Sequence, residues 1–134
     1  MSEENEATII EADIWDFLKK DTIINTLVDN NIFPGELPDP PPLPAITYSL
    51  ISRYSVRDLS GAIYWQSRFQ FSCWSDRYSG AKALAKAVSS VFESYIGEIG
   101  SFKILDSTMA NETDLNQPDS DLYQVSIDVL IKHK

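Results

Sequence analysis

Prolines gather in one short segment and limit what the chain can form there. Six of the seven prolines lie within residues 33–50, "FPGELPDPPPLPAITYSL". Each proline fixes φ and removes an amide donor, so residues 34–44 cannot form a helix or a central strand. This composition predicts an extended polyproline II segment on the surface, which straps a helical start to a following strand.

Two helices are predicted before the proline segment. Residues 8–20 repeat apolar side chains at helical spacing, with acids early and two lysines last, as the helix dipole favours. A second, short helix covers residues 21–29, with Asp21 or Thr22 as its cap. The dipeptide "IF" at 32–33 then predicts a very short strand or a turn.

Two stretches with alternating side chains follow, residues 45–54 and 62–74, and they predict an antiparallel hairpin joined by the connection 55–61. In the first strand, one face carries Ile46, Tyr48 and Leu50, and the other carries Thr47, Ser49, Ile51 and Arg53. In the second strand, one face carries Ile63, Trp65, Phe69, Phe71 and Cys73, and the other carries Tyr64, Gln66, Arg68, Gln70 and Ser72.

The clearest helical pattern is "AKALAKAVSSVFESYIG" at 81–97, which follows Ser75 or Asp76 as N-cap candidates and stops at Gly97. The remaining predicted elements are a strand over 99–110, a polar turn over 111–121 and a closing strand over 122–132, antiparallel to the strand at 99–110.

One antiparallel sheet with an amphipathic helix on its apolar face accounts for all these stripes. We therefore predict an α+β fold, in which a mostly antiparallel β-sheet packs against one main amphipathic helix, with N-terminal helices, in the order α-α-β-β-α-β-β. The length of 134 residues suits a single domain over 1–134. Residues 1–7 are expected to be disordered.

Charge excludes several classes of partner. The net charge is −9, with −8 in residues 1–40, +3 in residues 41–105 and −4 in residues 106–134. Phosphate contacts need clustered lysine and arginine, so neither nucleic-acid binding nor membrane-surface binding is expected. One cysteine excludes an internal disulfide, and the acidic N-terminus predicts no signal peptide, so a reducing cytoplasm is the expected site of synthesis.

Catalytic and metal-binding constellations are not apparent in the sequence. His133 is the only histidine and lies next to the C-terminus, where chain ends are usually mobile. Cys73 lies on an apolar strand face and is expected to be a buried hydrophobe. The acids Asp114, Asp119 and Asp121 lack the spacing of a calcium loop and predict a solvated turn. We expect no enzyme activity, no cofactor and no metal.

The proline segment also contains the PxxP spacing, at Pro38–Pro41 and Pro41–Pro44. This spacing occurs in ligands of SH3-like domains, but no basic residue flanks it here. A structural strap is the favoured interpretation.

Short motifs in a fixed order give the sequence a resemblance to a known family. The motifs are Phe33–Pro34, Pro44–Ser52, Leu59–Gly61, Arg68–Phe71, Tyr78 and Ala81–Val88. In this order they resemble the tail-completion or tail-to-head joining proteins of long-tailed bacteriophages, over about residues 20–95. The resemblance implies a fold like that of the tail terminators, with a mostly antiparallel sheet flanked by helices.

The same resemblance implies a non-catalytic virion protein. Copies would close into a sixfold ring that caps the tail tube and faces the head connector, with DNA passing through without specific binding. Assembly would take place in the bacterial host cytoplasm. The alternatives are another head–tail connector or tail-tube component, or a cytoplasmic adaptor that presents its PxxP segment.

Residues of the hairpin are the candidates for contacts with neighbouring copies or partners. Charged side chains in a loop can set the register of a partner and the rate of association. The candidates in and beside the connection 55–61 are Arg53, Arg57, Asp58 and Leu59, and those on the polar strand face are Tyr64, Gln66 and Arg68.

Overall fold

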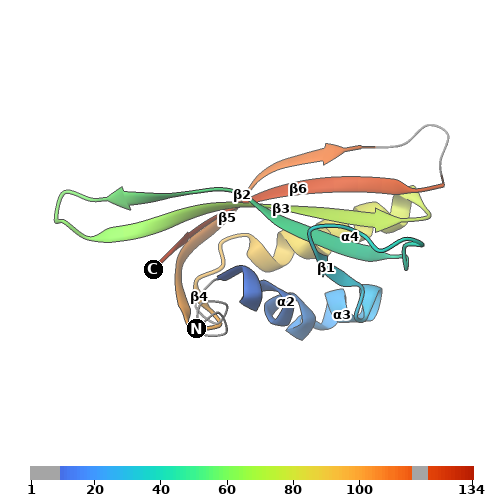
Figure 1. Ribbon diagram of the computed structural model, residues 1–134, viewed down its shortest axis with the longest axis horizontal. Helices are drawn as coiled ribbons and strands as arrows, with labels where there is room; N and C mark the ends of the chain where they lie inside the picture. The colour runs from blue at the N-terminus through green and yellow to red at the C-terminus, as the bar shows by residue number, and fades with distance from the viewer. Residues whose placement is uncertain (1–9, 116–120) are drawn as a thin grey trace.

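The computed structural model describes residues 10–115 and 121–134, and it contains a layer of helices against a six-stranded sheet (Figure 1). The elements are α2 (Ile10–Lys20), α3 (Thr22–Val28), β1 (Ile32–Pro34), β2 (Ala45–Arg57), β3 (Ile63–Ser75), α4 (Tyr78–Phe92), β4 (Gly97–Ile99), β5 (Phe102–Asp114) and β6 (Tyr123–His133). The α+β class and the predicted order of elements are confirmed. The expected disorder of residues 1–7 lies outside the described residues.

The sheet has the strand order β1-β2-β3-β6-β5-β4. β1 is parallel to β2, and all other neighbours are antiparallel. The predicted hairpin of β2 with β3 is therefore present, as is the predicted antiparallel pairing of β5 with β6. β6 lies in the middle of the sheet, and its inner face consists of β-branched residues, which suit a buried strand.

The three described helices lie against one face of the sheet, and the core lies between the two layers (Figure 1). α4 contributes a stripe of small and aliphatic residues that ends in Phe92. The ring of Phe92 stacks on Phe71 of β3, with centroids 4.8 Å apart, and on Phe17 of α2 at 5.4 Å. Trp15 and Tyr48 tie α2 to the sheet, because their polar tips donate to the carbonyls of Ile32 and Glu11.

The proline segment is the return connection between two parallel strands. β1 and β2 run in the same direction, so the chain must travel back from Pro34 to Ala45 between them. Asn31 holds the end of this path by donating to the carbonyl of Pro44. The strap bends at 35–36, 39–40 and 43–44, so the predicted extended polyproline II conformation is interrupted at these positions. The Asp39–Pro40 and Leu43–Pro44 peptide bonds are cis.

The predicted ends of the main helix are also wrong. Its N-cap is Arg77, which makes no side-chain capping bond, and the helix ends at Phe92 rather than at Gly97. The chain leaves the helix because Glu93 and Ser94 bind the edge of β5: the Glu93 carboxylate accepts from the amide of Met109, and the Ser94 amide donates to the carbonyl of Ser107. Long-range contacts of this kind leave no local sequence signal.

The predicted strand at 99–110 is in fact two strands. β4 and β5 form a tight hairpin around Gly100, whose φ of +60° suits glycine in the turn. β5 then continues to Asp114, into the region predicted as a polar turn. Among the described residues, no helix is long and apolar enough to cross a membrane.

Candidate functional site

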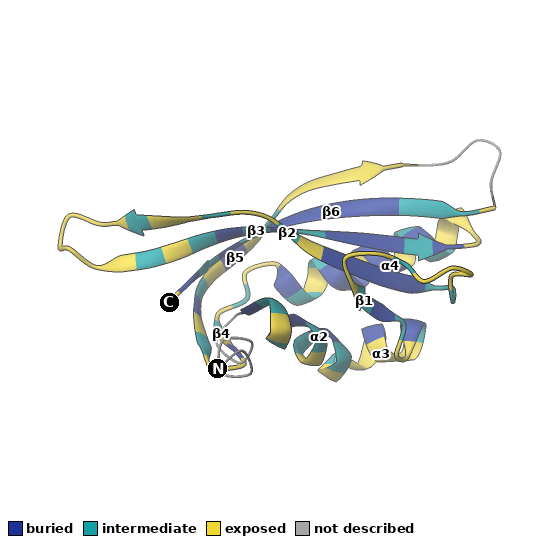
Figure 2. Cartoon of the chain, in the orientation of Figure 1, coloured by how far each residue is buried: buried dark blue, intermediate teal, exposed yellow. Residues whose placement is uncertain are grey.

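The candidate contact residues lie on or beside a hairpin arm that extends past the helices. The arm is defined here as residues 53–66, the distal parts of β2 and β3 with the loop between them (Figure 1). Exposed positions are concentrated on this arm, whereas the proximal parts of the same strands are buried (Figure 2). The arm is therefore a surface element built on a buried base.

The loop at the tip of the arm is shorter than predicted and is held by Asp58. β2 continues to Arg57, so Arg53 and Arg57 are strand residues, and the predicted connection 55–61 is corrected to 58–62. The Asp58 carboxylate accepts from the amides of Ser60 and Ala62 and from the Ser60 hydroxyl, and these bonds lower the pKa of Asp58. Leu59 is fully exposed at the tip.

One face of the arm carries apolar residues and a cation without a partner in the described chain. Arg57 lies directly opposite Ile63 in the register, and Trp65 follows two residues later on the same face. Ile63 is 48% exposed and Trp65 is 43% exposed, while Phe69 and Phe71 on the same face are fully buried. Among the described residues, Arg57 makes no ion pair. The row of apolar residues on the inner face of β3 thus continues beyond the part of the strand that the helices cover.

Tyr64 and Gln66 lie on the other face of the arm, as predicted from the alternation. The ammonium of Lys132 from β6 lies over the Tyr64 ring, 4.7 Å from its centroid. This cation–π contact holds the outer face of the arm at its base.

Arg53 lies on the opposite face from the one predicted. The pairing shifts between Leu50 and Ser52, so Ile51 is an extra residue in β2 and the alternation reverses beyond it. Arg53 therefore points to the helix side of the sheet. It donates to Glu11 of α2 at 2.7 Å and to the Ser67 hydroxyl at 2.7 Å.

Ser67 and His133 continue this network into the interior, and sequence reasoning missed it. The Ser67 hydroxyl and Nε2 of His133 are 2.8 Å apart, and both residues are buried. A serine hydroxyl that accepts from Arg53 can still donate to Nε2 or accept from it, so the donor in this bond depends on the imidazole tautomer. Burial, and then the nearby Arg53 charge, lower the pKa of His133. Ser67 and His133 are buried and therefore inaccessible to a substrate. Together with Arg53 and Glu11 they link α2 to β2, β3 and β6.

His133 was expected near a mobile terminus, yet it is a regular residue of the central strand. It pairs with Trp65 of β3 and with Ile104 of β5. The signal was present in the sequence, because His133 continues the inward alternation Val125, Ile127, Val129 and Ile131.

Arg68 lies on the outer face of the sheet, as predicted, and is paired there. Its guanidinium donates twice to Oδ2 of Asp128 in β6, at 3.1 and 2.7 Å. Gln70 donates to the other carboxylate oxygen at 3.2 Å. Both carboxylate oxygens of Asp128 accept these bonds, and the Arg68 charge is neutralised by Asp128. The main effect of Arg68 is therefore to link β3 to β6, rather than to bind a partner.

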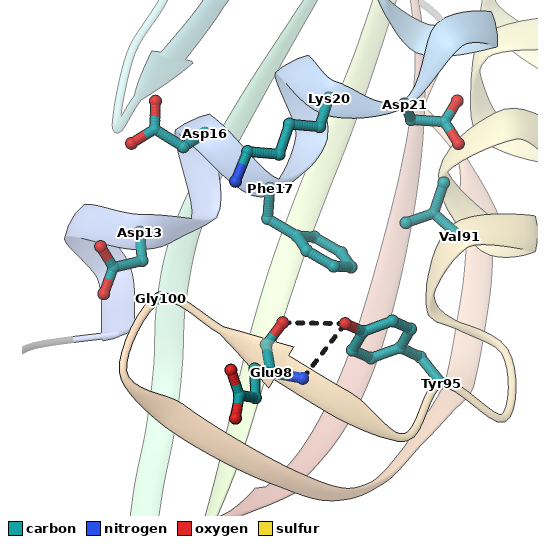
Figure 3. Close-up of a pocket in the computed structure, with 9 residues that line it drawn as sticks. All are labelled: Asp13, Asp16, Phe17, Lys20, Asp21, Val91, Tyr95, Glu98 and Gly100. Carbon is teal, nitrogen blue, oxygen red and sulfur yellow. Dashed lines mark hydrogen bonds between the residues drawn. The ribbon is translucent and has the colours of Figure 1, made fainter.

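A pocket of about 560 Å³ lies between α2, the end of α4 and β4 (Figure 3). Phe17 and Tyr95 form an aromatic floor, with centroids 4.9 Å apart, and the Tyr95 hydroxyl is fixed by the backbone of Glu98. The wall is acidic: Asp13, Asp16 and Glu98 line it together with Lys20 and Asp21. In the described part of the chain, neither Asp13, Asp16 nor Glu98 is in an ion pair.

The pocket could not be predicted because its walls come from distant segments. Asp13 and Asp16 occupy the solvent side of a helical stripe, where the sequence indicates ordinary solvated charges. Tyr95 and Glu98 follow the end of α4, which the sequence pattern placed at Gly97 instead of Phe92. The signal that remained was the surplus of acids in residues 1–40.

Cys73 is buried on the inner face, as predicted, and burial raises the pKa of its thiol. Asp114 accepts from Tyr78 and Lys82 of α4, and the bond from Tyr78 is the main cause of its lowered pKa. Asp119 lies outside the described residues. Within the described ranges, no group of three or more histidine, cysteine or acidic residues could hold a metal ion.

A family model described as "Tail completion protein gp17" matches residues 12–134. The chain therefore belongs to the tail completion protein family of bacteriophages, and the resemblance noted from the motifs is confirmed.

A solved structure with a similar fold is "Virion of native gene transfer agent (GTA) particle". The two chains superpose with a TM-score of 0.70, at 17% identity and with 92% of each chain covered. At this identity the likeness shows the fold. No curated protein matches the sequence.

Proposed function

We propose that this chain completes the phage tail as a ring, in the form of a hexamer, and joins the tail tube to the head connector. The observation that carries the proposal is the family match over residues 12–134, which includes every described element of the sheet. The mechanism is binding and geometry. Copies associate head to tail and close into a ring at the head–tail interface.

The shape and charge of the chain support this role. The arm extends past the helices and provides a projecting element for contacts between copies (Figure 1). A heterologous ring requires such an element and a different surface on the next copy that receives it. The net charge of −9 supports passage of DNA without specific binding, because phosphate contacts need clustered basic residues. Partners on the two faces of the ring are the tail-tube protein and the head-completion or connector protein.

Deletion of the gene in a particle-producing strain tests the proposal. The expected result in electron micrographs is filled heads and separate tails, with joining restored by the wild-type gene on a plasmid. Tails that never form would point to a tail-tube component instead. Normal, infective particles in the absence of the gene would contradict the proposal.

A further inference from the structure

We propose that the arm of one copy inserts into the acidic pocket between α2 and β4 of the next copy. This inference rests on the proposed function, and it names the contact that would close the ring. The occupant of the pocket is a second copy of this chain, and the contacting groups are Arg57, Leu59 and Ile63 of the arm.

The arm carries features that the folded monomer leaves uncovered. Leu59 is fully exposed, and Ile63 and Trp65 lie at inward positions of β3 but remain 48% and 43% exposed. Arg57 shares their face and has no carboxylate partner in the described chain. An exposed apolar group with a cation in its centre is typical of a protein contact surface.

The pocket is complementary to this surface in both respects. Its floor of Phe17, Val91 and Tyr95 is apolar, which suits Leu59 and Ile63. Its wall holds the carboxylates of Asp13, Asp16 and Glu98, which suit the Arg57 guanidinium (Figure 3). Within the described ranges these carboxylates and this guanidinium lack ion-pair partners in their own copy.

The pocket also has space beyond the arginine site. A smaller hollow of about 220 Å³ continues it along α4, sharing Asp21 and Val91, and its rim includes the exposed Ile23. The two hollows form one trough between α2 and α3 on one side and α4 on the other. The apolar residues that line this extension, Ile23, Ala83 and Val91, suit an apolar arm tip such as Leu59.

The two surfaces are different patches on one chain, so their contact is heterologous. Each copy gives one arm and receives one, and repetition closes a ring when the rotation allows it. In the closed ring every copy is held by two such contacts, and the last contact forms at high effective concentration, so the ring is more stable than an isolated pair.

Thiol cross-linking in assembled particles tests the contact. A chain with Leu59→Cys and Val91→Cys replaces the wild-type chain, and purified particles are treated with a short bis-maleimide and run on a denaturing gel. Cys73 is fully buried and does not react in the folded chain. We expect bands at two and more chain masses. The matched control combines Leu59→Cys with Ser49→Cys, which is exposed elsewhere on β2, and should stay at one chain mass.

The results separate this inference from the proposed function. Chains present in joined particles but linked no better than the control overturn the arm contact and leave the joining role intact. A band at the combined mass of this chain and a different virion protein also overturns it, because the occupant is then not a second copy. Absence of the wild-type chain from the head–tail junction of joined particles overturns the proposed function itself.

A charge exchange between the arm and the pocket tests the same contact without introduced cysteines. Arg57→Asp and Asp16→Arg should each reduce the yield of joined particles by about 10-fold or more, because each places like charges together. The double variant should restore the yield to within about 3-fold of wild type. A double variant no better than the worse single variant contradicts the proposal.

Discussion

The two halves of the β2–β3 hairpin, its covered base and its arm, have different surroundings, although inward positions of β3 carry apolar residues in both halves. Under α2 and α4, the inward residues Phe69 and Phe71 are fully buried, whereas Ile63 and Trp65 on the same face of the arm are almost half exposed. The alternation sets the face of a side chain, and the layer above it sets its burial. The apolar residues outside the covered half are the ones that the proposed contact between copies would cover.

The largest difference between the halves should appear in the cost of removing one isoleucine from each. Ile46→Ala in the covered half creates a cavity and should lower the free energy of unfolding by about 2–5 kcal/mol. Ile63→Ala in the arm should lower it by less than about 1 kcal/mol, because solvent fills the space. Urea unfolding followed by circular dichroism measures both. Equal losses would show that the arm belongs to the core.

Two arginines of one strand provide the next comparison. Arg53→Ala removes bonds to Glu11 and to the buried Ser67 and should cost about 1–2 kcal/mol of stability. Arg57→Ala removes no bond within the described chain and should change stability by less than about 0.5 kcal/mol while reducing particle joining. If Arg57→Ala lowers the free energy of unfolding as much as Arg53→Ala does, Arg57 makes stabilising bonds within its own chain and is not free for a partner.

Acidification should weaken the covered half through His133. Burial lowers the pKa of His133 in the folded chain, so the unfolded chain, with a pKa of about 6.5, takes up the proton first. Stability is then complete above about pH 6.5 and is lost as the pH falls from there towards the folded pKa. The urea midpoint should fall between pH 7.5 and about pH 6, and this slope should disappear in His133→Gln. A midpoint that rises on acidification would contradict the assignment of a neutral His133.

The smallest expected effect is at the tip of the arm. Leu59→Ser should leave the free energy of unfolding within about 0.5 kcal/mol of wild type, because Leu59 is fully exposed. The same change should lower the yield of joined particles. Ser60→Ala serves as a matched control at the tip, since it keeps Leu59 and removes a bond to Asp58. Unchanged particle yield with Leu59→Ser would remove the tip from the contact.

Much of the fold could be predicted from local pattern. The strands from Ile63 and from Tyr123 begin within one residue of the predicted positions, because apolar and polar side chains alternate there without interruption. The first two helices were also predicted within two residues of their observed ends. Local periodicity determines these elements, and long-range contacts change them little.

The errors occurred where one distant contact decides the outcome. The face of Arg53 depends on the extra residue Ile51, and the end of α4 depends on the contacts of Glu93 and Ser94 with β5. A single bulge reverses every later position of a strand, and its presence depends on the partner strand. The acidic pocket could not be predicted for the same reason, since it exists only once Asp13 and Tyr95 are brought together.

Electron cryomicroscopy of the head–tail junction in purified particles would show directly whether this chain lies there. We expect a ring of copies of this chain between the tail tube and the connector, with the arm of each copy in the pocket of its neighbour. A junction built of other proteins, with this chain absent, would show that it does not complete the tail at that position.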